Sequence, residues 1–203
     1  MDALKVGKKI IEEEIKAIER VSKNLDENFV ITVETIKSCE GKVVFTGLGK
    51  SGHIGKKLAA TFSSTGTPAI FVHATEALHG DLGMITKGDV VIAISNSGET
   101  KELIQMIPSL KIIGTKIISI TSNENSTLAK KSHIHIKVDA TREADHLNVA
   151  PTSSTTAVLA VGDAIGITLS ILKGFKEDNF AVFHPGGSLG KMLLGKISLE
   201  ETV

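Results

Sequence analysis

Residues 89–100 read DVVIAISNSGET, a short apolar run that ends abruptly in polar residues. The apolar part, 90–94, has no polar interruption, which is typical of a parallel strand covered on both faces. The polar part begins where that strand should end. Because open parallel α/β sheets bind ligands outside the carboxyl ends of their strands, we expect a binding site at this junction.

The same alternation of strand and helix extends along most of the chain. Short apolar runs predict strands at 42–46, 68–72, 89–94, 116–120 and 133–137. Helical patterns fall at 52–64, 99–112 and 125–131, and a long helix is expected at 151–173. This order predicts an α/β fold, a doubly wound domain with a five-stranded parallel sheet flanked by helices and right-handed crossovers.

The segments around this core complete the predicted domain. An amphipathic helix with Ile11, Ile15 and Ile18 on one face opens the chain, and a second helix follows at 27–38. Residues 139–150 show no regular pattern. We expect one domain over 1–203, with N-terminal helices in 1–38 and the core in 40–195.

Composition limits the partners of the protein. The 203 residues carry 23 Lys plus Arg and 23 Asp plus Glu, so no basic surface for nucleic acid or an acidic membrane is expected. Small molecules or copies of the chain are the expected partners. Cys39 is the only cysteine and the N-terminus has no apolar leader, which predicts a cytoplasmic protein.

A glycine-rich turn, TGLGKSGHIG, follows the first predicted strand. Gly47, Gly49 and Gly52 match the dinucleotide pattern GxGxxG, which leaves a nicotinamide-dependent dehydrogenase as an alternative. Lys50 and Ser51, however, place side chains where a pyrophosphate needs bare backbone. The turn therefore indicates a general anion site at a helix N-terminus, with one lysine beside it.

Two groups of hydroxyl residues indicate the class of ligand. In SNSGET, three hydroxyls surround a glycine that allows close backbone approach, at the start of a helix. A helix cap at Ser97 and a dipole-favoured acid at Glu99 would explain that motif without any ligand. The second group, 152–156, has five consecutive hydroxyl residues, although a cap needs only one. Together the two groups favour a sugar phosphate.

These motifs resemble a known family. GLGKSGHIG, TFSSTGTPAIFVHATEALHGDLGMI, VVIAISNSGET, APTSSTT and HPGGSLGK are similar to sugar isomerase (SIS) domains of the arabinose-5-phosphate isomerase type. The resemblance covers roughly residues 40–195 and implies interconversion of D-ribulose 5-phosphate and D-arabinose 5-phosphate by a homotetramer with shared active sites and no cofactor. The family commonly continues into tandem CBS domains, whereas this sequence ends at Val203, as expected of either a natural short form or a piece of a longer chain. Residues 144–149 lack the usual Cys-Pro.

The resemblance also implies roles for individual residues. The catalytic set is His184 as the principal proton shuttle, Glu99, Glu143 and His79 as further acid/base groups, and Lys50 as the stabiliser of negative charge. The phosphate-binding set is Ser51, Ser95, Ser97 and Thr100, with the backbone of Gly49 and Gly98. The second hydroxyl group adds Ser153, Ser154 and Thr155 as substrate contacts.

Two alternatives to this function remain at this point, a non-catalytic phosphosugar-binding domain and an isomerase for another sugar phosphate. SIS domains also serve as phosphosugar sensors, for which the acid/base residues would be dispensable. His133 and His135 alternate along a predicted strand at a spacing that could hold zinc, but a polar edge-strand face is the expected explanation, and no metal site is predicted. No firm role is assigned to His53, His73 or His146.

Overall fold

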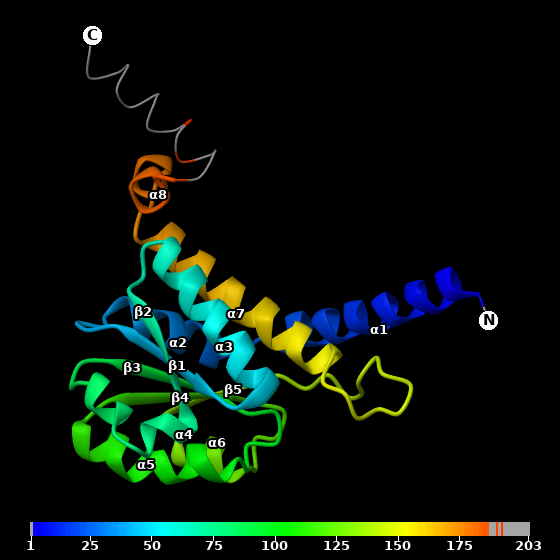
Figure 1. Ribbon diagram of the computed structural model, residues 1–203, viewed down its shortest axis with the longest axis horizontal. Coiled ribbons are helices and arrows are strands. Elements are labelled where there is room, and N and C mark those ends of the chain that lie inside the picture. Colours follow the sequence, from blue (N-terminus) through cyan, green and yellow to red (C-terminus); the bar gives the residue numbers. More distant parts are fainter. Residues whose placement is uncertain (1, 187–189, 191, 193–203) are drawn as a thin grey trace.

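The computed structural model describes residues 2–186, 190 and 192, and its centre is a five-stranded sheet in the order β2-β1-β3-β4-β5 (Figure 1). All four strand pairings are parallel, as predicted. The strands are β1 (Val43–Gly47), β2 (Ala69–His73), β3 (Val90–Ile94), β4 (Lys116–Thr121) and β5 (Ile134–Lys137).

The two innermost strands explain the uninterrupted apolar runs. Every residue of β1 and of β3 is buried, because helices cover both faces of the sheet. The register pairs Val43 with Val90 and Gly47 with Ile94, so these strands end at the same level. The loops that follow Gly47 and Ile94 therefore begin side by side.

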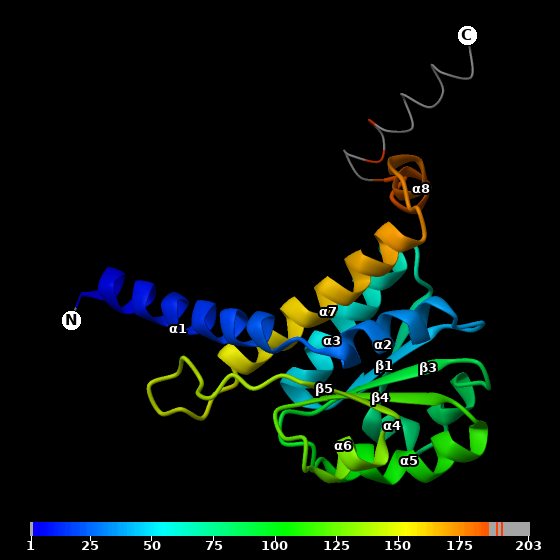
Figure 2. The same ribbon diagram turned by 180° about the vertical axis from the view of Figure 1, so that it is seen from behind.

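Helices lie on both faces of the sheet, which confirms the doubly wound prediction (Figures 1 and 2). One layer holds α1 (Ala3–Asn24), α2 (Glu27–Lys37), α3 (Gly49–Ser64) and α7 (Ser153–Leu172). The other holds α4 (Ala74–Ala77), α5 (Lys101–Ile113) and α6 (Thr127–Lys131). Two apolar clusters fill the spaces between sheet and helices, one on each face. The first half of α1 extends beyond the rest of the fold.

Three short elements were not expected from the sequence. These are α4, the 3₁₀ turn η1 (Asp81–Met84) and α8 (Glu177–Phe183). The α5 helix also begins at Lys101 rather than at 99, because Gly98 has φ +69° and Thr100 is the extended N-cap residue. Residues 187–189 and 191 of the HPGGSLGK motif, and residues 193–203, lie outside the described part of the chain.

The long helix α7 is the main support of its layer. It contacts α1, α2 and α3, and Gly162 and Gly166 let it approach Leu58 and Phe62 of α3 closely. Its length and apolar composition would also suit a membrane span, but packing against three helices already accounts for that composition. An ion pair of 2.6 Å between Lys57 and Asp163 joins α3 to α7 at the surface.

Candidate functional site

A polar cavity lies where the sheet was expected to bind a ligand. It has a volume of about 280 Å³ and collects residues that follow β3, β4 and β5 together with the start of α7. Its polar lining includes Asn96, Ser122, Asp139, Arg142, Glu143, Asn148 and Ser154. A smaller hollow of about 40 Å³ shares Asn96, Pro151 and Ser154 with it and adds Ser51 and Thr155.

The cavity and the hollow bring together several residues that the sequence singled out. Ser51 comes from the first turn of α3, Glu143 from the irregular segment after β5, and Ser154 and Thr155 from the first turn of α7. Asn96 and Ser122 were not singled out. Each lies within two residues of the end of a central strand, which was the available signal.

The SNSGET segment folds into a tight turn whose hydroxyls hold its shape. Ser95 is 3% exposed, its Oγ accepts a hydrogen bond from Gly98 N at 3.0 Å, and it lies 2.8 Å from Thr100 Oγ1. Ser97 is exposed, and its Oγ accepts from Glu99 N at 3.2 Å. None of the three lines the polar cavity. Phosphate binding by these hydroxyls stays a prediction.

The Glu99 carboxylate caps a neighbouring helix. Its Oε1 accepts a hydrogen bond from Thr127 N, in the first turn of α6, at 2.7 Å. That backbone hydrogen bond is the main reason why the pKa of Glu99 lies below its ordinary value. Glu99 does not line the polar cavity, and its acid/base role stays a prediction.

The Glu143 carboxylate lies at the cavity and closes the N-terminus of α7. Its Oε2 accepts hydrogen bonds from Thr152 N at 2.7 Å and from Ser154 N at 3.1 Å, and Thr152 Oγ1 donates to it at 3.3 Å. Burial acts to raise the pKa of Glu143, but hydrogen bonding by Ser154 and Thr152 outweighs burial and lowers it. The group is therefore a carboxylate at neutral pH, able to accept a proton.

The segment that carries Glu143 is held by its own side chains. Thr141 and Asn148 adopt left-handed backbone conformations, with φ of 66° and 55°. Asn148 Oδ1 accepts from Glu143 N at 2.7 Å, and Asp145 Oδ2 accepts from Val149 N and Ala150 N at 3.2 and 3.1 Å. Internal hydrogen bonds thus fix this segment even though it contains no helix or strand and no Cys-Pro.

The remaining substrate contacts expected from α7 differ in access. Ser153 and Ser154 are both buried, at 0% and 4% exposed, and neither hydroxyl has a hydrogen-bond partner among the described residues. Thr155 lines the hollow, and its hydroxyl donates to Thr152 O at 2.9 Å. Ser154 lines both the polar cavity and the hollow and Thr155 lines the hollow, whereas Ser153 lines neither.

Lys50 and His79 are exposed and lie outside the polar cavity. Lys50 is in the first turn of α3, directly after the backbone of Gly49, which has φ +51°. His79 follows α4, the short helix that begins where β2 ends. Since β1 and β2 are neighbours in parallel register, both residues follow strands that end at the same edge of the sheet, the carboxyl edge.

His184 lies far from that edge within the same chain. It directly follows α8, where its ring stacks on Phe180 at a centroid distance of 3.8 Å and its Nδ1 lies 2.9 Å from Phe180 O. The 20 residues of α7 separate Ser154 from this end of the molecule, about 30 Å at 1.5 Å per residue (Figure 1). One chain does not bring His184 to Glu143.

The two alternating histidines make separate contacts. His133 Nδ1 accepts from Ile117 N at 2.9 Å, while His135 Nε2 lies 2.9 Å from Thr121 Oγ1. Both contacts link the edge strand β5, or the residue before it, to β4. Within the described part of the chain, no group of three or more His, Cys, Asp or Glu side chains is arranged to hold a metal ion.

Comparisons with known proteins agree with this fold and site. Residues 36–168 match the model of the SIS domain. The chain is 47% identical to arabinose 5-phosphate isomerase KdsD of Shigella flexneri over 197 residues, an alignment that covers 97% of this chain and 60% of that protein. It is 51% identical over 187 residues to KdsD of Francisella tularensis, covering 91% of this chain and 57% of that protein.

A solved structure extends the comparison. The c3406 protein of Escherichia coli CFT073, determined in complex with arabinose 5-phosphate, is 48% identical, superimposes with a TM-score of 0.89, and covers 91% of this chain and 100% of that one. The chain spans about 60% of the length of the curated relatives it matches. On the family match, the identities and the shared fold, the chain belongs to the SIS domain family.

Proposed function

We propose that this protein is an aldose–ketose isomerase that interconverts D-ribulose 5-phosphate and D-arabinose 5-phosphate. The observation that carries the proposal is the Glu143 carboxylate, held ionised at a polar cavity beside Asn96 and Ser154. Identity of 47% to an isomerase named for arabinose 5-phosphate, and of 48% to a protein solved with that sugar phosphate, supports the choice of substrate.

The reaction moves a proton between C1 and C2 through an enediolate, so it needs a base, a stabiliser of the oxyanion and a proton relay. Glu143 is the base, because its carboxylate is ionised and reaches the cavity. Lys50 is the cation that stabilises negative charge developing on the sugar oxygens. Glu99, His79 and His184 supply the relay for protons on those oxygens.

The phosphate binds where backbone donors converge. The first turns of α3 and α5 each leave free N–H groups at the carboxyl edge of the sheet. Ser51 in α3 and Ser95, Ser97 and Thr100 before α5 add hydroxyls at those two helix starts. Ser154 and Thr155, in the first turn of α7, contact the sugar hydroxyls, because both line the hollow next to Ser51.

The proposed enzyme is a homotetramer with active sites shared between subunits. The distance of about 30 Å along α7 keeps His184 from the Glu143 of its own chain, so His184 serves the site of a neighbouring subunit. A neighbouring subunit also covers the aliphatic residues of α1, since Leu4 and Ile11 are 69% and 61% exposed in the single chain. The free, half-buried thiol of Cys39 suits a cytoplasmic location.

The test is isomerisation in deuterium oxide. The protein is incubated with phosphates of ribulose, ribose, xylulose, arabinose, fructose and glucose, and the products are identified by NMR. We expect ribulose 5-phosphate and arabinose 5-phosphate to interconvert, with deuterium at C2 of the aldose. Turnover of another pair with none of this one would contradict the substrate, and binding without any isomerisation would contradict the enzyme.

A phosphosugar sensor is the second candidate, and one observation favours it. Phosphate binding needs only the backbone donors and hydroxyls, whereas Glu99 is engaged as the cap of α6. Ser97→Ala distinguishes the two, because it removes an exposed hydroxyl donor without disturbing the buried Ser95. For an enzyme the variant raises KM and keeps kcat. For a sensor it weakens binding of the sugar phosphate and there is no turnover to measure.

A further inference from the structure

The helix α7 begins without the cap that its sequence offers. Thr152 is the N-cap residue, and a threonine at that position ordinarily accepts a hydrogen bond from a backbone N–H in the first turn of its own helix. The Thr152 side chain makes no such hydrogen bond. The Glu143 carboxylate takes its place, because Oε2 accepts from Ser154 N at 3.1 Å. The Thr152 hydroxyl is therefore free for other partners.

The Thr152 hydroxyl holds the segment that carries Glu143. Its Oγ1 accepts a hydrogen bond from Ala144 N at 2.8 Å and donates one to Glu143 Oε2 at 3.3 Å. On the other side of the Glu143 Cα, Glu143 N donates to Asn148 Oδ1 at 2.7 Å. The backbone N–H groups before and after this Cα are thus both bound, and so is one of the two carboxylate oxygens.

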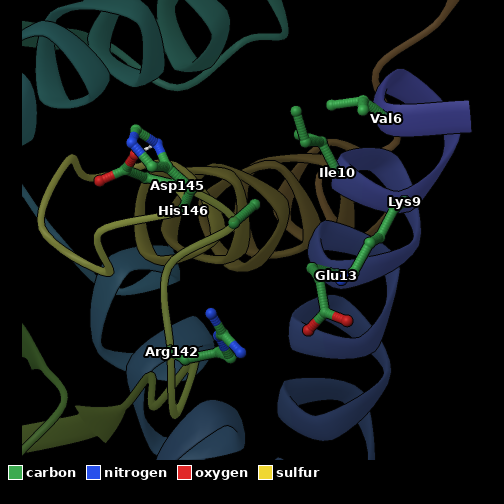
Figure 3. A pocket seen from close by; sticks show the side chains of 8 residues that line it. Val6, Lys9, Ile10, Glu13, Arg142, Asp145 and His146 are labelled. Carbon is green, nitrogen blue, oxygen red and sulfur yellow. Dashed lines mark ion pairs between the residues drawn. The ribbon is translucent and has the colours of Figure 1, made fainter. Parts of the chain in front are cut away.

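Packing on the far side of the segment does not replace these hydrogen bonds. A second cavity, of about 590 Å³, separates the segment from the first half of α1 (Figure 3). Arg142 and Asp145 lie across this cavity from Val6 and Ile10 of α1. Within one chain, the place of Glu143 therefore depends on polar contacts with the start of α7 more than on a wall of packed side chains.

The second carboxylate oxygen of Glu143 is left open. Within the described part of the chain, Oε1 accepts no hydrogen bond, and it is not among the side-chain atoms that are buried without a partner. Oε1 is therefore accessible, on a side chain that lines the polar cavity. One bound oxygen and one open oxygen suit a positioned base, because the bound oxygen sets the direction of the open one.

We propose that Thr152 is the positioning residue of Glu143, and that Oε1 is the carboxylate atom that takes the proton from the sugar. The inference rests on the proposed function, since it takes Glu143 as the base. In that step a C–H bond of the sugar breaks, an O–H bond forms at Oε1, and the electron pair stays on the sugar as the enediolate. Thr152 lines neither the polar cavity nor the hollow, so it acts through Glu143 and not on the substrate.

Two substitutions of Thr152 test the role of its hydroxyl. Thr152→Val removes the hydroxyl and keeps the shape of the side chain, whereas Thr152→Ser keeps the hydroxyl. Thr152→Val should lower kcat by about tenfold to a hundredfold, the scale expected for a displaced catalytic group, and leave KM unchanged. Thr152→Ser should recover most of kcat. The matched control is Thr115→Val, which removes a buried hydrogen bond to Leu110 O at the opposite edge of the sheet and should keep both constants.

The pKa of Glu143 gives a readout that does not depend on turnover. Hydrogen bonds from Thr152 help to lower this pKa, so Thr152→Val should raise it. NMR of labelled glutamate carboxyl carbons measures the change, and Glu143→Gln identifies the resonance. Asp139 and Arg142 at the polar cavity and Asp145 in the same segment are present in both proteins, so the difference reports the lost hydroxyl. The acid limb of kcat/KM should move to higher pH by the same amount.

The outcomes separate the positioning role from the enzyme. An unchanged pKa of Glu143 in Thr152→Val overturns the proposal, whether or not the protein isomerises a sugar. A raised pKa in a protein that isomerises no sugar phosphate supports the hold of Thr152 on Glu143 and removes the proposed function. A higher KM at unchanged kcat would make Thr152 a substrate contact. That result, a Thr152→Ser protein as slow as Thr152→Val, or an equal loss in Thr115→Val would each overturn the positioning role.

Discussion

Replacing Glu143 by glutamine and by alanine separates its observed role as a helix cap from its proposed role as a base. Thr152 N, Ser154 N and Thr152 Oγ1 all donate to the same oxygen, Oε2. A glutamine can place its carbonyl oxygen at that position and keep all three hydrogen bonds. Alanine removes the acceptor and leaves the N-terminus of α7 without a cap.

The expected stability changes follow from this geometry. Glu143→Gln loses only the charge at a helix N-terminus, which costs about 0.3 to 1 kcal/mol of unfolding free energy. Glu143→Ala loses the cap, which costs about 2 kcal/mol for a site of this degree of burial. Urea unfolding followed by circular dichroism at one fixed protein concentration measures both, and the concentration must match because assembly of the proposed oligomer adds to stability.

The activity of the two variants tests the base. Glu143→Gln should lose turnover by about 10² to 10⁴, the usual contribution of a positioned acid/base group, while it stays folded. Wild-type turnover in Glu143→Gln would remove Glu143 from the chemistry. A glutamine variant as unstable as the alanine variant would refute the assignment of all three hydrogen bonds to one oxygen.

Contacts at three other positions give further predictions. Burial lowers the pKa of His133, whose neutral ring accepts a hydrogen bond from Ile117 N. The stabilisation from His133 is therefore complete above the pKa of the unfolded chain and is lost as the pH falls through the pKa of the folded protein. The free energy of unfolding, measured from pH 8 to pH 5, should show this loss, and His133→Asn should reduce it. Asp89→Ala should cost about 3 kcal/mol in urea unfolding, because the 1% exposed carboxylate bonds Lys42 at 2.8 Å. Gly98→Ala should cost about 1 to 3 kcal/mol at φ +69° and raise KM for the sugar phosphate.

The sequence predicted the sheet well because its signals are local. Each strand is a short run of β-branched residues between turns, so every predicted strand matches an observed one to within one or two residues at each end. The short α8 gave no such signal, because its seven residues, EDNFAVF, are too few for a helical period to be clear. The strand order also depends on contacts between distant segments.

The candidate site was less predictable, because residue type does not say where a side chain points. Glu99 and Glu143 both lie in polar loops at the carboxyl edge of the sheet. Only the structure shows that one carboxylate caps α6 and the other reaches the polar cavity. Similarly, Ser95 and Ser97 are two positions apart, yet the first is buried within its turn and the second is exposed.

The position of Glu143 depends on the packing of a helix some distance from it. Residues 139–150 contain no helix or strand, so the hydrogen bonds to Thr152 and Ser154 at the start of α7 set the place of the carboxylate. The course of α7 is set in turn where Gly162 and Gly166 let it lie against α3. Since α3 also carries Ser51, close packing of these two helices fixes the distance between the proposed base and the turn that we propose binds the phosphate.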